Sequence, residues 1–168
     1  MADDVDEVVA AWGARHPDWD LRGMAVLGRI SRLELLAEVR RAAAIRDTGL
    51  STADVDVLAS LWRHPEGLRP RDLRSTMMIG SGTLTPRLDR LEAEGLLSRA
   101  PDPEDRRGRV LTLTPRGRQL APEVVRRLLD VENGLLEAVP GEVRARLAED
   151  LRTLLVAVEV DRADADGG

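Results

Sequence analysis

The sequence predicts a mainly α-helical fold with one small β-hairpin, and three observations support that prediction. Apolar residues recur at helical spacing along most of the 168-residue chain. One segment, Arg109–Leu113, instead alternates apolar and polar residues as a half-buried strand does. With 43% hydrophobic and 33% charged residues, the composition is that of a globular domain with helical extensions rather than of a disordered chain.

The composition also excludes several classes of site. Cysteine is absent, which excludes disulfides, thiolate metal sites and cysteine nucleophiles. Only two histidines are present, so a His-rich metal centre is not expected, and no cofactor is predicted. The sequence contains no phosphate-binding loop, dinucleotide fingerprint or Ser-His-Asp order, so it does not predict an enzyme. The acidic start and the lack of a long apolar run predict a cytoplasmic protein.

Residues 1–48 are predicted to form two helices. The first covers Asp3–Arg15 and is interrupted at His16–Asp18. Its apolar stripe consists of Val5, Val8, Val9 and Trp12. A long helix follows over Leu21–Arg46 and is expected to end at Gly49. Its wide apolar band is typical of a helix that packs on several neighbours.

Residues 49–114 are predicted to form a unit that begins with a helix capped by Ser51. Asp54, three residues later, completes this cap. The predicted buried face of the helix consists of Val55, Leu58, Leu61 and Trp62. A short helix to Met78 then begins at Pro70, because a proline at the first helical position has no intrahelical hydrogen bond to lose.

A second helix of this unit is predicted over Thr83–Glu94, after a tight turn at Ile79–Gly82. Gly95 is expected to end this helix. Its inward residues are Leu84, Leu88 and Leu91. A strand over Leu96–Arg99 then pairs with the alternating strand described above, and the turn that joins them, Pro101–Gly108, is rich in charge.

Residues 115–168 are predicted to form two more helices. Thr114-Pro115 opens the first, which is expected to run to Asn133-Gly134. The second covers Glu142–Val160, and Asp161–Gly168 is expected to fray.

A short helix, a tight turn, a second helix and a hairpin in this order form a winged helix-turn-helix, here over Ser51–Leu113. In such a unit the second helix enters the major groove of DNA, and the hairpin reaches the minor groove or the phosphates. The charge distribution agrees. The net charge is −5, but residues 69–118 contain 11 Arg against 7 acidic residues, a balance of +4. All 25 basic residues are Arg, which binds phosphate bidentately.

The segment SGTLTPRLDRLEAEGLL at Ser81–Leu97 closely resembles the MarR family of transcriptional regulators, as do DPEDRRG at Asp102–Gly108 and LTPRG at Leu113–Gly117. The resemblance implies a homodimer whose terminal helices intertwine and whose two winged units read a palindromic operator in double-stranded DNA. Long terminal helices also need a partner to bury their apolar faces. The expected function is a ligand-responsive transcriptional regulator that acts as a repressor.

Several outward residues of the second helix are predicted to contact DNA, namely Ser81, Thr83, Thr85, Pro86, Arg87 and Arg90. Pro86 departs from the family pattern, in which Asn is usual, and this removes one candidate base reader. A proline is tolerable at this position if Thr83 is the helix cap.

Arg106, Arg107 and Arg109 of the hairpin are predicted to contact the minor groove or the phosphates. A second interpretation is that Asp105 forms a structural ion pair with one of its two arginine neighbours. Both can hold, because a carboxylate that fixes one guanidinium leaves another free for DNA.

The added first helix and the segment Trp12–Asp20 resemble the branch of the family that responds to urate or trans-aconitate. That resemblance implies an anionic metabolite bound by Trp12, Asp56 and Arg99, with Arg87 linked to the pocket or to signal transmission. A guanidinium binds planar anions bidentately, an indole stacks on a flat solute, and an arriving anion repels a nearby carboxylate. Movement of the helix that carries Asp56 would then tilt the second helix of the winged unit.

Simpler interpretations remain open for these residues. Trp12 could serve only to anchor the first helix, and Asp56 and Arg99 could form a plain ion pair. Other aromatic residues are predicted to be packing tryptophans or surface histidines, namely Trp19, Trp62, His16 and His64.

Alternatives also remain for the whole chain. It could be a constitutive winged-helix DNA-binding protein without a ligand. It could also be a protein-interaction module on the same fold, although such a module would not need a basic hairpin. A metal-sensing repressor is disfavoured by the lack of cysteine and the scarcity of histidine.

Overall fold

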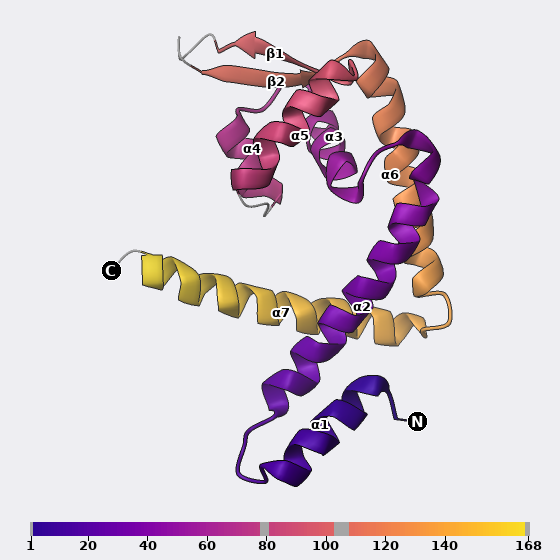
Figure 1. Cartoon of the computed structure of the whole chain (residues 1–168), viewed down its shortest axis with the longest axis vertical. Coiled ribbons are helices and arrows are strands. Elements are labelled where there is room, and N and C mark those ends of the chain that lie inside the picture. The colour runs from indigo at the N-terminus through magenta and orange to yellow at the C-terminus, as the bar shows by residue number, and fades with distance from the viewer. Residues whose placement is uncertain (1, 78–80, 103–107, 167–168) are drawn as a thin grey trace. The chain divides into compact units, whose positions relative to one another are not determined.

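The computed structural model describes residues 2–77, 81–102 and 108–166. Within these ranges, only the backbone is described for 74–76, 81–83 and 161–166. The described residues form a mainly helical structure with one antiparallel two-stranded sheet (Figure 1), which confirms the predicted fold class. No helix among them is long and apolar enough to cross a membrane.

The elements follow one another in the predicted order. They are α1 (Asp4–Arg15), α2 (Arg22–Ala44), the 3-10 helix η1 (Arg46–Thr48), α3 (Thr52–Arg63), α4 (Pro70–Met77), α5 (Ser81–Ala93), β1 (Leu97–Pro101), β2 (Arg109–Leu113), α6 (Pro115–Leu135) and α7 (Gly141–Asp166). The chain divides into two compact units, Met1–Val131 and Glu132–Gly168.

Local capping signals set the first residues of several helices. At α1, Asp3 is the N-cap and exchanges hydrogen bonds with Asp6, which completes a capping box. Ser51 and Asp54 form the same box at α3, as predicted. Prolines stand at the first positions of α4 and α6, where they sacrifice no helical hydrogen bond.

Several predicted boundaries differ from those of the structure. α2 ends at Ala44, two residues before the predicted Arg46, because the amide and the hydroxyl of Thr48 both donate to the carbonyl of Ile45 and tighten the chain into η1 before Gly49. α5 already begins at Ser81, so residues 81 and 82 are helical and do not belong to a turn; residues 78–80 lie outside the described part. α7 continues to Asp166, because no glycine or proline interrupts it before Gly167.

The hydrophobic core is centred on the winged unit and extends into α6. Its fully buried side chains come from α3, α4, α5, both strands and α6, and include Leu58, Leu73, Leu91, Leu111 and Val124. The predicted inward leucines of α5 and three of the four predicted residues of α3 are confirmed as core.

Trp62 is the exception in α3, with 53% of its surface exposed. The buried face of α3 also includes Val57 and Ser60, so it is centred away from Trp62. The prediction that Trp62 packs in the core of its own chain is therefore wrong.

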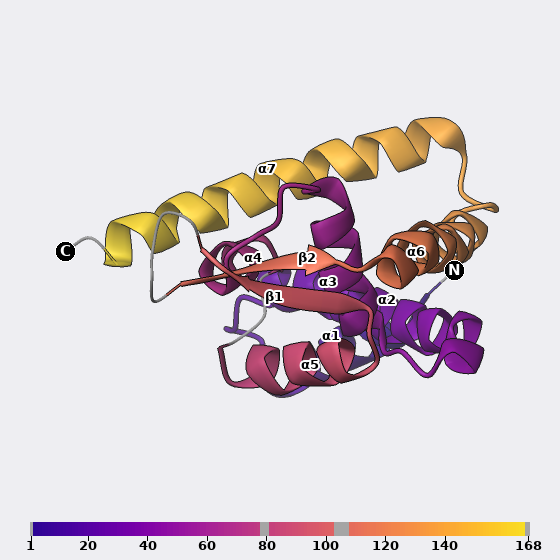
Figure 2. The same cartoon turned by 90° about the horizontal axis from the view of Figure 1, so that it is seen from above.

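The hairpin is held beside α5 and α3 (Figures 1 and 2). Its strands pair in register from Leu97 with Leu113 to Pro101 with Arg109. The chain then enters α6 so closely that a Cβ at Gly117 would lie 1.9 Å from the carbonyl oxygen of Leu96. This contact gives a physical reason for the glycine in the LTPRG motif.

α1 lies along the first half of α2. Arg29 of α2 binds the carboxylates of Asp3 and Asp6, and Val5 of α1 packs over Gly28, where a Cβ would come within 3.1 Å of its Cγ1. No described side chain of α1 is buried in the single chain.

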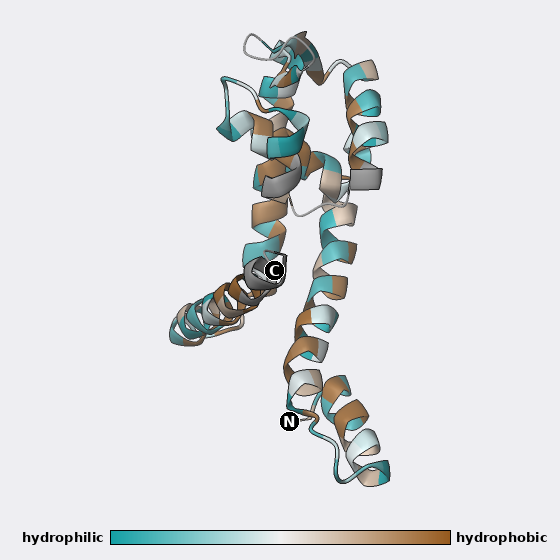
Figure 3. Cartoon of the chain, turned by 90° about the vertical axis from the view of Figure 1, so that its left-hand side faces the viewer, coloured by the Kyte–Doolittle hydropathy of each residue, from teal (hydrophilic) through white to brown (hydrophobic). Residues whose placement is uncertain are grey.

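Large apolar side chains of the long helices remain exposed. On α2 they are Met24, Val26, Leu27, Leu33, Leu35, Leu36 and Val39. On α7 they are Leu147, Leu151, Leu154, Leu155, Val156, Val158 and Val160. Figure 3 shows hydrophobic and hydrophilic segments alternating along α7. Exposed apolar area of this extent is typical of surfaces that bind another protein.

Candidate nucleic-acid interface

α5 occupies the place of a recognition helix, after α4 and before the hairpin (Figure 1). Its leucines face the core, while Thr85 and Pro86 are exposed on the opposite side. The side chains of Ser81 and Thr83 lie outside the described part. Because α5 begins at Ser81, Thr83 is not its cap, and Pro86 lies inside the helix, where it cannot donate to the carbonyl four residues earlier. The predicted condition for tolerating this proline is therefore not met.

The carboxylate of Asp54 joins α3 to α5. Asp54 is fully buried, and its Oδ1 accepts a hydrogen bond of 2.7 Å from Nη1 of Arg87. Its Oδ2 accepts from Nη2 of Arg90 and, at 2.6 Å, from both the amide and the hydroxyl of Ser51. Arg90 also donates to the carbonyl of Gly49, which lies two residues before Ser51. One acidic side chain thus caps α3 and fixes two arginines of α5.

The electrostatics of this cluster favour the charged forms. Burial would raise the pKa of Asp54, but the hydrogen bonds from Arg90, Ser51 and Arg87 outweigh it and hold that pKa below its ordinary value. The hydrogen bond to Asp54 likewise raises the pKa of Arg90. A buried carboxylate is stable here because it is paired on both oxygens.

Two of the residues predicted to contact DNA take part in this arrangement. The guanidinium groups of Arg87 and Arg90 both bind Asp54 of α3, while the Arg87 side chain is 19% exposed and that of Arg90 is 41% exposed. The arrangement also bears on the predicted ligand residues. The carboxylate that contacts Arg87 is that of Asp54, whereas Asp56 lies on the exposed side of α3.

The hairpin presents one described arginine from the predicted set. Arg109 is exposed at the start of β2 and donates to the carbonyl of Gly108. Arg106, Arg107 and the predicted partner Asp105 lie outside the described residues.

Two sets of ion pairs attach the hairpin to the helices below it. At the end of β1, the buried Asp102 accepts from Arg69, which directly precedes α4, with 2.5 Å between Nε and Oδ2. In the middle of β1, Arg99 pairs with Asp89 at 2.6 Å and with Glu92 at 3.0 Å, both on α5. Arg99 therefore connects the hairpin to the recognition helix.

Trp12 lies in a row of aromatic rings between α1 and α2. The His16 ring stacks on that of Trp19 with 3.8 Å between centroids, and Trp12 lies 5.5 Å from Trp19. A hollow of about 230 Å³ beside these rings is lined by Ala11, Trp12, Arg15 and His16. His16 and His64 are half-buried rather than freely exposed, and Nδ1 of His64 lies 3.1 Å from Glu66.

The predicted ligand residues do not form one cluster within a single chain. Gly13, next to Trp12, lies beside Leu21 at the start of α2, whereas α3 contacts α2 at Glu38 through Thr52. The 17 residues from Leu21 to Glu38 correspond to about 25 Å of helix. Trp12 and the cluster around Asp54 are therefore at opposite ends of α2.

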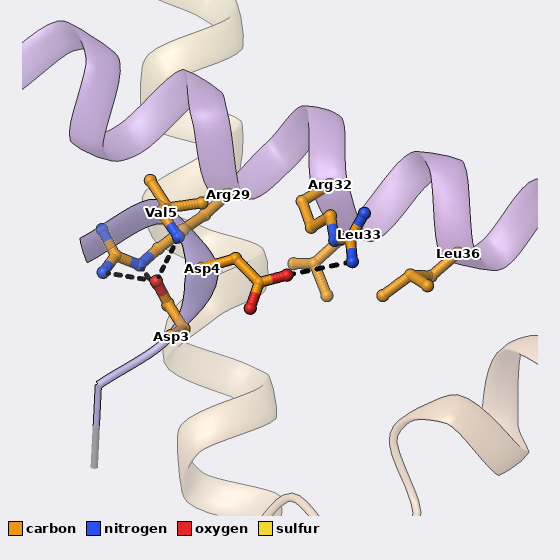
Figure 4. A pocket seen from close by; sticks show the side chains of 7 residues that line it. All are labelled: Asp3, Asp4, Val5, Arg29, Arg32, Leu33 and Leu36. Carbon is orange, nitrogen blue, oxygen red and sulfur yellow. Dashed lines mark hydrogen bonds and ion pairs between the residues drawn. The ribbon is translucent and has the colours of Figure 1, made fainter. Parts of the chain in front are cut away.

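A second hollow, of about 350 Å³, lies between α1 and α2 (Figure 4). Apolar side chains of Val5, Leu33 and Leu36 line it. At its edge, Arg32 donates to Asp4 at 3.0 Å, and Arg29 is bound by carboxylates of α1. Its cations are already neutralised, so the hollow does not favour an anion. No group of acidic and histidine side chains among the described residues is arranged to hold a metal ion.

Asp54 and Asp102 are the residues whose roles sequence reasoning missed. Asp54 was recognised only as part of a helix cap. An aspartate next to Val55 and Val57, on the apolar side of the helix, was a usable signal, because a carboxylate there must find a cation. Asp102 carries no comparable signal, since its partner Arg69 is 33 residues away.

Comparisons with known proteins agree with this geometry. A model of the MarR family matches residues 50–108. The HTH-type transcriptional regulator PecS of Dickeya dadantii (strain 3937) is 35% identical over 158 residues, which cover 93% of each chain.

Two solved structures share the fold. BpsR of Bordetella bronchiseptica, whose DNA binding is regulated by 6-hydroxynicotinic acid, superposes with a TM-score of 0.70 and 26% identity, over 77% of this chain and 91% of BpsR. The transcriptional repressor CouR, bound to a 23-mer DNA duplex, superposes with a TM-score of 0.71 and 26% identity, over 82% and 99% of the two chains. The winged helix-turn-helix and the similarity to PecS over nearly the whole length show that this chain belongs to the MarR family of DNA-binding transcriptional regulators.

Proposed function

We propose that this regulator is a ligand-responsive repressor that binds a palindromic operator as a homodimer. One α5 of each protomer would enter a major groove, with the two half-sites about one helical turn apart. Arg106, Arg107 and Arg109 of each hairpin would contact the minor groove or the phosphates. A small anionic metabolite such as urate or trans-aconitate would release the DNA.

The exposed apolar faces of α2 and α7 support the homodimer. These helices carry many leucines and valines that their own chain leaves in contact with water. A second copy that covers these residues would remove a large apolar area from solvent, at about 25 cal/mol per Å². The relative CouR is seen on a DNA duplex, which supports the DNA-bound state.

The main observation in support of a ligand response is that Asp54 binds both Arg87 and Arg90. An anion that competes for Arg87 would weaken the connection between α3 and α5 and so change the placement of the recognition helix. The relative BpsR responds to 6-hydroxynicotinic acid, a flat carboxylic acid. Trp12, Asp56 and Arg99 remain the other proposed ligand residues, and their separation in one chain requires a rearrangement or a second copy to unite them.

Gel-shift titration with the intergenic DNA beside the gene tests DNA binding. Replacing Arg107 and Arg109 by Ala is expected to weaken binding at every operator and to flatten its salt dependence by roughly 0.9 in log–log slope per lost phosphate contact. A control with Arg40 and Arg126 replaced removes the same charge from exposed positions on α2 and α6 and should leave the slope near that of the unmodified protein. An unchanged slope in the hairpin variant would exclude the hairpin from the interface.

The ligand response is tested in the same assay with urate, xanthine, trans-aconitate and citrate. Arg99→Ala and Trp12→Ala variants are expected to bind the operator nearly normally but to lose the release by the effective anion. If none of the four anions releases the unmodified protein, constitutive DNA binding becomes the better interpretation. If the double variant responds at unchanged concentrations, the assignment of the pocket residues is wrong.

A further inference from the structure

Asp102, at the end of β1, is a buried acidic residue of the hairpin. Its side chain is 1% exposed, and its two oxygens accept from Nε and Nη2 of Arg69 at 2.5 and 3.3 Å. Two parallel hydrogen bonds between a guanidinium and a carboxylate fix orientation as well as distance. The amide of Asp102 also donates to the carbonyl of Gly108, which joins the two strands at the far end of their register. Asp102 thus links the outer end of the hairpin to the chain that precedes α4.

The residues next to Arg69 bind the other strand. Leu68 exchanges two backbone hydrogen bonds with Leu111, of 3.0 and 2.8 Å, and so forms an isolated antiparallel bridge at the edge of β2. Gly67 lies so close to β2 that a Cβ would be 2.4 Å from Val110. It also adopts a φ of +95°, which glycine tolerates best. Three consecutive residues therefore hold the hairpin, and α4 begins immediately after them at Pro70.

The other attachment of the hairpin is weaker. Arg99 binds Asp89 and Glu92 of α5, but these carboxylates are 57% and 39% exposed, so water can replace them. The carboxylate of Asp102 is shielded from water, and an uncharged amide in its place would remove the charge from a pair whose acidic partner is buried. Of the two ion-pair attachments among the described residues, the buried one, Arg69 with Asp102, therefore fixes the end of β1 more firmly.

We infer that Arg69 and Asp102 are positioning residues for DNA binding, which set the angle at which the hairpin approaches the duplex. They act through Arg109, which follows the residue that bonds to Asp102 and is exposed at the start of β2. The inference rests on the proposed contact between the hairpin and DNA. It adds that this contact is made only when the hairpin is fixed to the start of α4.

A double-mutant cycle on the full-length protein tests this inference. The salt dependence of binding to the intergenic duplex is measured for the unmodified protein, Arg109→Ala, Asp102→Asn and the double variant. Arg109→Ala alone should reduce the log–log slope by about 0.9 for each hairpin on the DNA. In the Asp102→Asn background, the same change should reduce the slope by less than a third of that amount, because the hairpin is no longer in place to make the contact.

Two further variants separate positioning from folding. If Asp102→Asn does not fold, Arg69→Gln breaks the same pair from its partly exposed side and should give the same loss of coupling. Arg69→Lys keeps the charge but not the bidentate geometry, and should restore part of the Arg109 effect. Asp89→Asn is the matched control, since it removes an exposed carboxylate from the other attachment, and it should leave the Arg109 effect intact.

The outcomes distinguish this inference from the proposed function. A full Arg109 effect in both Asp102→Asn and Arg69→Gln proteins would overturn it and leave the pair with a role in stability alone. No Arg109 effect in the unmodified protein would overturn the proposed contact of Arg109 with DNA, and the inference with it, whereas the variant with Arg107 and Arg109 both replaced tests the hairpin contact as a whole.

Discussion

The carboxylate of Asp54 in α3 and the guanidinium of Arg87 in α5 are joined at 2.7 Å across 33 residues of sequence. The same carboxylate binds Ser51 at the start of α3, so it belongs both to a local helix cap and to a contact between two helices. The start of α3 and the side of the recognition helix therefore cannot move independently. This connection makes a buried charge useful in a DNA-binding unit, because a change at α3 is passed to α5.

Asp54→Asn is expected to lower the free energy of unfolding strongly. The amide cannot neutralise Arg87 and Arg90, and removing one partner of a buried ion pair costs about 3–5 kcal/mol. Asp56→Asn, two residues away on the exposed side of α3, should change the free energy of unfolding by no more than about 1 kcal/mol. Urea unfolding of both variants measures the difference. Equal effects would show that Asp54 is not the residue that joins the two helices.

Protonation of Asp54 should contribute to the loss of protein stability at acidic pH. Its pKa in the folded protein lies below the ordinary value, so its contribution to stability is complete above the unfolded pKa of about 3.9 and is lost as the pH falls through the folded value. The Asp54→Asn protein should therefore lose less stability than the unmodified protein between about pH 5 and pH 2. Urea unfolding across this range measures the two slopes, and parallel curves would contradict the assignment.

The sequence predicts elements well where the signal is local. Ser51 with Asp54 and the proline at Pro70 mark helix starts within a few residues, and the leucines of α5 identify its inner face. The helical spacing of residues, however, predicts only the direction of each Cβ atom and not where the end of a long side chain lies. Arg87 directly precedes the buried Leu88, so its guanidinium can fold inward to an acid that no local pattern reveals.

The candidate site was therefore less predictable than the fold. The pairs Asp54–Arg87 and Arg69–Asp102 each join residues 33 positions apart, and only the tertiary structure decides which of many acids meets which arginine. Trp62 illustrates the same limit for apolar residues. Helical spacing placed it on the buried face of α3, but the packing of the neighbouring elements leaves 53% of it exposed.

Gly117→Ala is expected to be among the most destabilising single substitutions. Its Cβ would lie 1.9 Å from the carbonyl oxygen of Leu96, and backbone atoms on both sides cannot yield as a flexible side chain does. We expect a loss of more than about 3 kcal/mol, at the upper end of overpacking effects. Gly134→Ala is the matched control in the same helix, since nothing lies within 4 Å of its Cβ, and it should stabilise by up to about 1 kcal/mol. Thermal unfolding compares the two, and a tolerated Gly117→Ala would contradict the close contact between α6 and Leu96.

Gly28→Ala should selectively weaken the attachment of α1. Both Gly23 and Gly28 lie in α2, where alanine favours a helix by about 1 kcal/mol over glycine. At Gly23 the new methyl group meets nothing within 4 Å, whereas at Gly28 it comes within 3.1 Å of Val5 and pushes against α1. Gly23→Ala should therefore stabilise the protein, while Gly28→Ala should gain less and should increase hydrogen exchange of the α1 amides. Because α1 is held mainly by surface ion pairs to Arg29 and Arg32, this increase should be larger at high salt. If the amides of α1 exchange hydrogen at the same rate in both variants, the packing of Val5 over Gly28 does not contribute to the attachment of α1.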